Sequence, residues 1–379
     1  MASTLNVSVD LTPVGLYIHV PFCMAICPYC AFYKHPYNKA SMAQFVADLV
    51  VEIAHYNHHF GALPVDTIFF GGGTPNVVSK RDFSTIMTAI HSHFNVLPTA
   101  EITMEMNPGI HSVSKLEFFK RMGINRVSIG AQSFNDTVLT DYGRHHRVSD
   151  TLTFIQHIQD IGFATHSVDI IFGHRHHTEL HAMDSLEQVL KLNIPHVALY
   201  GLAILKNTPF HTMGMTIDDD QQADQYDTIQ GILNSSGYHQ YEVSNYCVTD
   251  AECNHNIKYW TFKPTIGLGP GAHSFFNGYQ YANRTQERWG TPPLATMATP
   301  NPEPVPLSLF LATRLRYLTP IFYHELLNHA PQSVCDSLIP KINESAKMGW
   351  MVADNESFQL SQRGCLLLDE IIGFLDIPS

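Results

Sequence analysis

The chain has 379 residues, of which 45% are hydrophobic and 15% carry a charge, so we expect a large domain with a smaller appendage. Its net charge is −12 with histidine neutral. No basic surface is therefore available to neutralise phosphates, and nucleic acid is excluded as a predicted partner. The first 15 residues contain no Lys or Arg, no Arg precedes Arg81, and no run reaches the roughly 18 apolar residues of a membrane span. We expect neither a targeting signal nor a transmembrane segment.

Short β-rich runs alternate with helical patterns from residue 16 to about 204. The predicted strands are 16–22, 66–72, 101–106, 126–132, 165–173 and 196–202. The predicted helices lie near 40–60, 79–94, 113–122, 149–161 and 178–191. Such alternation builds a parallel sheet through right-handed crossovers, and six units are too few to close an eightfold barrel. The predicted fold class is α/β, with a partial, TIM-like (β/α)6 barrel.

The pattern changes twice after the predicted barrel. Residues 205–300 read as a looser, irregular extension packed on the barrel, and NPEPVP (301–306) reads as a proline-rich boundary. Beyond it, helical patterns surround the short strand pair MVAD and SFQLS, which predicts a helical, winged-helix-like module. We therefore expect three units: a barrel over 1–204, an extension over 205–300 and a C-terminal domain over 301–379.

Seven cysteines are present, and three of them fall in one loop. The other four are scattered, which predicts reduced thiols in a cytoplasmic protein rather than a disulfide framework. They are Cys247, Cys253, Cys335 and Cys365.

The loop YIHVPFCMAICPYCAFYKH places Cys23, Cys27 and Cys30 in a C-x-x-x-C-x-x-C pattern. A closed zinc site needs four ligands, whereas three thiolates suit a 4Fe-4S cluster with one iron open to a small molecule. Two alternatives stay open at this point. One is a zinc site with His19 or His35 as the fourth ligand, and the other is a redox pair formed by Cys27 and Cys30.

Several candidate residues fall where the predicted strands end. Gly71 to Gly73, Glu105 and Gln132 each lie at the C-terminal end of a strand, and Asp169 lies near one. Active sites of parallel β/α architectures collect at this edge. Glycines there allow a close backbone approach, although a tight strand–helix turn explains them equally well.

The ordered segments of the chain resemble the radical S-adenosylmethionine (SAM) enzymes. These segments are the cysteine loop, FFGGGTPN, MEMNP, SIGAQSF, VDIIFG, HNIKYW and GLGPGAHS. Within that family the chain is most similar to the oxygen-independent coproporphyrinogen III oxidases and their heme-chaperone branch, HemW. The resemblance covers nearly the whole chain and implies that SAM chelates the open iron and is cleaved to a 5′-deoxyadenosyl radical.

The resemblance also implies a set of SAM contacts. They are Tyr17, Tyr29, Gly72, Gly73, Thr74, Glu105, Gln132, Arg144, Asp169 and Ala203. In the dehydrogenase, the last four positions line the cavity or a second SAM site. Core packing is the alternative for the two tyrosines, and an ordinary surface ion pair is the alternative for Arg144.

Two functions compete within this resemblance: decarboxylation of coproporphyrinogen III, and heme binding with transfer to an acceptor. Phe32 stands where the dehydrogenase carries a fourth cysteine, and only 22 residues precede Cys23 where the dehydrogenase has a longer extension. HNIKYW matches the H-N-x-x-Y-W motif of the chaperones, and His273 replaces an apolar contact to the second SAM. We therefore expect a heme chaperone without dehydrogenase activity.

His255 of HNIKYW is the candidate heme contact, because imidazole is a common axial ligand; a hydrogen-bonded structural histidine is the alternative. The run HRHH (174–177) departs from the family's pattern and offers further histidines. The resemblance implies two protein partners, a flavodoxin- or ferredoxin-like electron donor and a heme acceptor such as a membrane respiratory protein. A cluster protein without radical chemistry is the third hypothesis, so SAM turnover is left open.

Overall fold

The computed structural model describes residues 12–174, 179–277, 279–285, 299–300 and 305–377. Twelve strands form one sheet in the order β14-β13-β12-β11-β1-β4-β5-β6-β7-β8-β10-β9. Its six central strands are parallel: β1 (Val14–Val20), β4 (Pro64–Gly72), β5 (Asn95–Met106), β6 (Arg126–Gln132), β7 (Thr165–Phe172) and β8 (His196–Gly201). All six were predicted, and the α/β fold class is confirmed. The described strands form an open sheet whose ends are β14 and β9.

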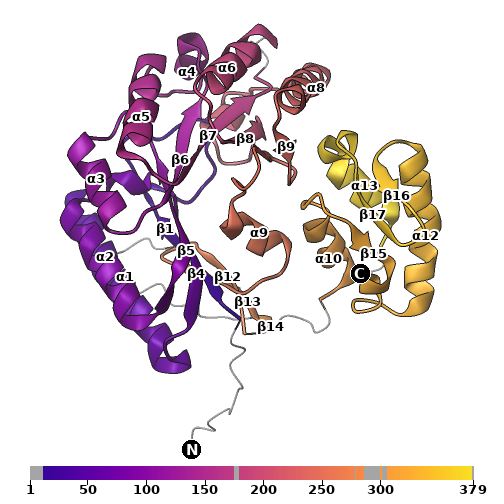
Figure 1. Ribbon diagram of the computed structural model, residues 1–379, viewed down its shortest axis with the longest axis horizontal. Helices are drawn as coiled ribbons and strands as arrows, with labels where there is room; N and C mark the ends of the chain where they lie inside the picture. Colours follow the sequence, from indigo (N-terminus) through magenta and orange to yellow (C-terminus); the bar gives the residue numbers. More distant parts are fainter. Residues whose placement is uncertain (1–11, 175–178, 278, 286–298, 301–304, 378–379) are drawn as a thin grey trace, which may run out of the picture.

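Helices follow the strands and cover the outer face of the sheet (Figure 1). They are α1 (Lys39–Phe60), α2 (Lys80–His93), α3 (Val113–Arg121), α4 (Asp136–Asp141), α5 (Val148–Ile161) and α6 (Glu179–Lys191). In α2, Phe83, Ile86, Met87 and Ile90 are buried, which is the i, i+3, i+4, i+7 spacing of one apolar face. Only α4, a short helix, was not predicted.

The region after residue 204 is more regular than the sequence indicated. It contains α7 (Pro209–Thr212), α8 (Asp219–Ser235), α9 (Asn254–Trp260), β9 (His239–Gln240), β10 (Asn245–Cys247), β11 (Thr265–Leu268), β12 (His273–Phe276), β13 (Tyr279–Ala282) and β14 (Thr299–Pro300). The expectation of an irregular segment is wrong. The polar opening of α8, DDQQADQ, hides its apolar face, and strands of two to four residues give too short a pattern to recognise.

These later strands extend the barrel sheet on both sides. β11 pairs in parallel with β1, and β10 pairs antiparallel with β8. The sheet is therefore continuous across residue 204, and the division into three units stays a prediction.

The C-terminal residues form a second hydrophobic core beside the barrel (Figure 1). Its helices are α10 (Leu307–Arg314), α11 (Tyr323–Leu326), α12 (Gln332–Lys347) and α13 (Leu368–Leu375). Its strands are β15 (Ile321–Phe322), β16 (Met351–Ala353) and β17 (Ser357–Leu360). The predicted strand pair is confirmed by antiparallel pairing of β16 with β17. Most of the boundary NPEPVP lies outside the described residues.

None of the helices that the structure describes combines the length and the apolar composition needed to cross a bilayer.

Candidate functional site

The three-cysteine loop lies directly after β1 and is closed at its base by a short parallel pair. Its strands are β2 (Phe22–Cys23) and β3 (His35–Pro36). The Tyr37 amide also donates to the Cys23 carbonyl (2.8 Å), and the Lys34 ammonium donates to the Cys30 carbonyl (2.7 Å). These bonds pair the segment after the loop with the segment before it, so all three cysteines lie in one compact loop.

The geometry of the loop does not support the zinc alternative. Tetrahedral zinc with bonds near 2.3 Å requires sulfurs about 3.8 Å apart. Within the described residues, however, the three sulfurs do not belong to any group of donor atoms that all lie within 4.8 Å of one another. His19 is also engaged elsewhere, because its Nε2 donates to the Tyr33 carbonyl (2.8 Å) and its Nδ1 contacts the Tyr17 hydroxyl (3.1 Å). His35 bonds the Tyr33 hydroxyl at 2.8 Å.

The glycines after β4 bring this strand end against the cysteine loop. The Gly73 amide donates to the Val20 carbonyl (2.8 Å), and a β-carbon on Gly73 would lie 2.8 Å from the Phe22 backbone nitrogen. Gly72 has φ of 107°, and a β-carbon there would lie 2.7 Å from the His19 ring. Close packing of the chain on itself therefore requires both glycines. Their contact with SAM stays a prediction.

Thr74 follows these glycines and connects the same strand end to the first cysteine. Its side chain is buried, and its hydroxyl is hydrogen-bonded to the Cys23 thiol. Burial raises the pKa of Cys23, and this hydrogen bond opposes the rise. Thr74 thus contacts the loop's first sulfur directly.

Glu105, at the end of β5, is a carboxyl group of the barrel interior with a strongly raised pKa. Burial raises its pKa to about 8, the nearby Asp169 adds to the rise, and the Gly72 amide, which donates to its Oε2 (3.2 Å), opposes it. The polar groups that shift its pKa are thus an acid and an amide, while Arg126 lines the same cavity. A cationic ligand group such as the ammonium of SAM suits such a carboxylate.

Asp169 lies two strands away on β7 and faces the same interior. The Ser128 hydroxyl donates to its Oδ1 at 3.0 Å. Burial raises the pKa of Asp169 to about 6, while Ser128, Arg126 and Arg144 oppose the rise. Two acids with raised pKa values therefore lie on one face of the sheet.

Arg144 contacts the cysteine loop, and the surface ion-pair alternative is not supported. Its guanidinium donates to the Gly130 carbonyl (2.8 Å), to Asn107 Oδ1 and to Cys27 Sγ (3.5 Å). Gln132 lies beside it at the end of β6 and has a positive φ of 66°, a strained backbone for a residue other than glycine. These contacts place a fixed positive charge beside one candidate cluster ligand.

The other predicted SAM contacts are Tyr29, Tyr17 and Ala203: the two tyrosines pack against aromatic rings, and the alanine is exposed. Tyr29 is half-buried, and its ring packs edge-on against Tyr142 (centroids 5.5 Å apart) and near Phe210 (6.4 Å). Tyr17 stacks on Phe69 at 6.1 Å. Ala203 is exposed just beyond β8.

A cavity of about 180 Å³ opens on the inner face of the sheet. Alternation along each strand turns side chains from all six parallel strands into it. They are Tyr17, Phe69, Glu105, Arg126, Ser128, Ser167, Asp169, His196, Ala198 and Tyr200. The cavity therefore brings three of the ten predicted SAM contacts together. The other seven are not among its lining residues: Tyr29, Gly72, Gly73, Thr74, Gln132, Arg144 and Ala203.

His255 reaches this cavity from α9. Its Nδ1 pairs with the Thr67 hydroxyl (2.8 Å), its Nε2 pairs with the Tyr259 hydroxyl (2.9 Å), and its ring stacks on Phe69 at 5.3 Å. Burial lowers the pKa of His255 to about 3, with a further contribution from Lys258. Both ring nitrogens are thus already bonded, which favours the structural alternative. Its role as a heme contact stays a prediction.

Two asparagines that the sequence analysis did not single out join the segments FFGGGTPN and MEMNP to each other. Asn76 Nδ2 donates to the carbonyls of Asn107 (3.1 Å) and Ile110 (2.8 Å), and its Oδ1 accepts from the Asn107 amide (3.1 Å). Asn107 in turn accepts from Arg144. The available signal was an asparagine just after the strand in both FGGGTPN and MEMNP. Of HRHH, only His174 belongs to the described residues.

The fold and the three-cysteine loop together define a radical SAM protein, and residues 17–189 match the Radical SAM superfamily model. The superfamily uses a 4Fe-4S cluster and SAM. The chain is 30% identical over 374 residues to "Heme chaperone HemW" of Escherichia coli, covering 96% of this chain and 98% of that protein. It is 29% identical to the Bacillus subtilis protein of the same name, covering 94% and 97%. The chain therefore belongs to the HemW family of radical SAM proteins.

A solved structure supports the fold independently. Coproporphyrinogen III oxidase (HemN) from Escherichia coli superposes with a TM-score of 0.81 over 96% of this chain and 90% of that one, at 20% sequence identity. At this identity the match concerns the architecture alone.

The residues present fit the cofactors of this superfamily. One loop supplies three thiols, and Arg144 and Thr74 contact two of them. Across the adjoining strand end, Glu105 is a half-buried acid with a raised pKa. These features match an iron–sulfur cluster beside a cationic ligand.

Proposed function

We propose that this protein is a heme chaperone that binds heme and transfers it to an acceptor protein. The observation that carries the proposal is the 30% identity to a relative named as a heme chaperone, across nearly the full length of both chains. Phe32, which stands where the dehydrogenase has a further cysteine, is 68% exposed. The dehydrogenase alternative has only the architectural match with coproporphyrinogen III oxidase in its favour.

An apolar rim beside the cysteine loop supports heme as the ligand. Met24, Ile26 and Phe32 of the loop are exposed. Phe210, whose amide donates to the Pro28 carbonyl (3.1 Å), joins the loop to the segment that carries Met213, itself 72% exposed. Large exposed apolar side chains in one region are typical of a binding surface. A porphyrin presents a flat apolar face of matching chemistry.

The remaining proposals concern cofactor chemistry and partners. When bound and reduced by one electron, the cluster would supply radical chemistry on SAM at this site. We propose that Cys23, Cys27 and Cys30 hold the cluster and that Glu105 orients the SAM ammonium group. We further propose a cytoplasmic protein with a flavodoxin- or ferredoxin-like electron donor and a heme acceptor. All seven cysteines are free in the structure, as a reducing compartment requires.

The proposal predicts heme uptake without decarboxylation. The cluster should be reconstituted without oxygen, and the protein then supplied with heme, or with coproporphyrinogen III, SAM and a reductant. We expect stoichiometric heme binding by difference absorbance and no CO2 release above a control without SAM. Stoichiometric CO2 would overturn the chaperone function.

His255 can be tested separately from the proposed function. We expect His255→Ala to destabilise the protein by about 2–4 kcal/mol, because it leaves a cavity and two hydroxyls without their partner. Heme affinity stays unchanged if the histidine is structural. Thr67→Val is the matched control, since it breaks the same network but keeps the imidazole. Heme titration and chemical denaturation measure the two effects. A large loss of heme affinity in His255→Ala, absent from Thr67→Val, would instead establish His255 as a heme ligand.

A further inference from the structure

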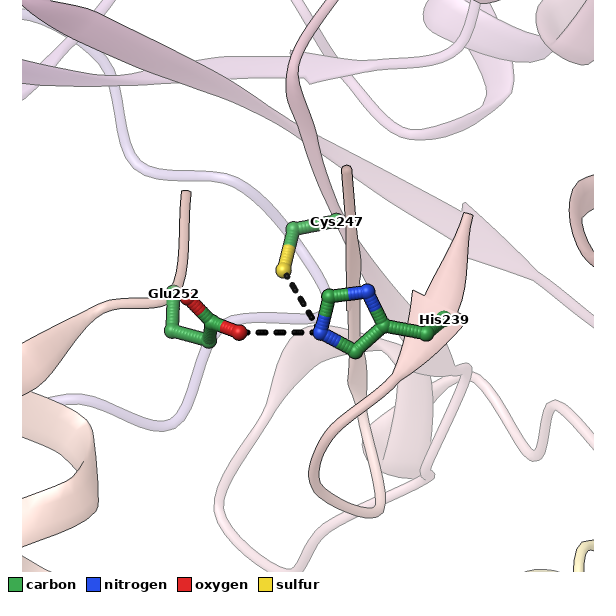
Figure 2. A group of neighbouring side chains, drawn as sticks. All are labelled: His239, Cys247 and Glu252. Carbon is green, nitrogen blue, oxygen red and sulfur yellow. Dashed lines mark hydrogen bonds and ion pairs between the residues drawn. The ribbon is translucent and has the colours of Figure 1, made fainter. Parts of the chain in front are cut away.

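The hairpin at the last edge of the sheet brings together three side chains that can bind a metal. His239 of β9 and Cys247 of β10 are cross-strand partners. Glu252 lies in the segment that leads from β10 to α9. Figure 2 shows the three side chains pointing toward one another. Among the described residues, they are the only three His, Cys, Asp or Glu side chains whose donor atoms all lie within 4.8 Å of one another.

The contacts converge on one nitrogen atom. His239 Nε2 lies 2.9 Å from Glu252 Oε1 and 3.6 Å from Cys247 Sγ (Figure 2). In a catalytic triad, the nucleophile and the acid contact different nitrogens of the imidazole. Here one nitrogen faces both partners, and its single proton can serve only one of them. A relay of protons therefore does not account for the arrangement.

The distances suit a tetrahedral ion. Zinc bonds of 2.0–2.1 Å to nitrogen and 2.3 Å to sulfur imply a nitrogen–sulfur separation of about 3.6 Å, which is the distance found between His239 and Cys247. The matching nitrogen–oxygen separation is about 3.4 Å, so Glu252 would move outward by a few tenths of an ångström. Its side chain is 30% exposed and has room to do so.

We propose that His239, Cys247 and Glu252 bind one Zn²⁺ ion, with water as the fourth ligand. One nitrogen, one sulfur and one oxygen donor form a borderline set that suits this metal, and three protein ligands leave one position open. The thiol loses its proton to solvent when it binds. The site opens to solvent through the His239 side chain, which is 46% exposed, whereas Cys247 is fully buried and forms its floor.

The ion links the hairpin to the start of α9. Glu252 lies two residues before Asn254, where α9 begins, and the same helix supplies His255 and Tyr259 to the barrel cavity. Bound zinc therefore fixes the segment that positions one wall of this cavity. This role is separate from the cysteine loop and does not depend on heme.

The test uses the protein with its iron–sulfur cluster in place, because empty cluster cysteines would themselves bind zinc. The cluster-loaded protein is titrated with Zn²⁺ against a chromogenic chelator, and X-ray absorption at the zinc edge reports the ligands. We expect one tight site with one sulfur near 2.3 Å and three lighter atoms near 2.0–2.1 Å. His239→Ala should weaken binding by roughly 100-fold, and Cys247→Ala should remove the sulfur contribution.

The His239 side chain is 46% exposed, so His239→Ala is not expected to disturb folding, whereas Cys247→Ala needs a check of its melting temperature. Cys335→Ala is the matched control, because this cysteine is also buried and free but lies in the C-terminal core. Zinc affinity in Cys335→Ala should equal that of the parent protein. Equal affinity in His239→Ala and the parent, or a zinc environment with several sulfurs, overturns the proposal.

Discussion

Replacing Cys23, Cys27 or Cys30 by alanine is expected to abolish the iron–sulfur cluster. Only three thiolates in this loop are available to hold it, and a cluster left with two protein ligands is not retained. Iron and acid-labile sulfide, measured after anoxic reconstitution, should fall from about four atoms of each per chain to near zero. The brown absorbance of the protein and its affinity for SAM should be lost with them.

A control variant shows whether the loss of iron is specific to the three loop cysteines. Cys335→Ala should retain its full iron content, because that cysteine is buried in the C-terminal core. Zinc without labile sulfide in the parent protein, or undiminished iron in all three alanine variants, would contradict the assignment of the loop.

Glu105→Gln is expected to stabilise the SAM-free protein at alkaline pH while weakening SAM binding. The pKa of Glu105 is about 8 in the folded protein against an ordinary value of 4.5. As pH rises from 4.5 to 8, the unfolded chain loses the proton first, so the free energy of unfolding falls across this window. Glutamine removes that loss and can still accept the Gly72 hydrogen bond. We expect a gain of about 2–4 kcal/mol at pH 8 and none at pH 4.

Chemical denaturation at both pH values measures this gain, and SAM titration of the cluster-loaded protein should show at least a roughly tenfold loss of affinity. Glu52→Gln is the contrasting control. Burial also raises the pKa of Glu52 to about 8, but its two oxygens accept from the Gly269 amide (2.8 Å) and from Asn283 (2.5 Å). Its replacement should destabilise the protein and leave SAM affinity unchanged. A Glu105→Gln variant that binds SAM normally would exclude this residue from the site.

Local patterns were enough to predict the six parallel strands of the barrel, but not α9 and the contacts around it. Each central strand is a β-rich segment of six or more residues between turn signals, so periodicity and punctuation located it. The surroundings of α9 depend on distant residues. Glu101 accepts from the amides of Asn254 (3.0 Å) and His255 (3.1 Å), and Thr67 binds the His255 ring. More than 150 residues separate these partners, and no local pattern records such a pairing.

The same limit applies to the candidate site. Gly72 and Glu105 lie at the C-terminal ends of two predicted parallel strands, so the sequence predicted that they would meet at that edge of the sheet. The structure joins them by a hydrogen bond. The contact between Arg144 and Cys27 crosses 117 residues. The resemblance to a known family suggested Arg144 as a cavity residue, but nothing in the sequence predicted its contact with Cys27, because a single arginine carries no pattern of its own.

The pairing of β11 with β1 has a consequence for when the metal centre can be assembled during synthesis of the chain. β1 precedes the cysteine loop, yet one of its two neighbours in the sheet is not made until Thr265–Leu268 have left the ribosome. Until then one side of β1 presents unpaired backbone groups to which another chain can add. Iron delivered before then would therefore meet a loop whose supporting strand is paired on one side only, so assembly of the metal centre is best suited to a chain that already includes β11.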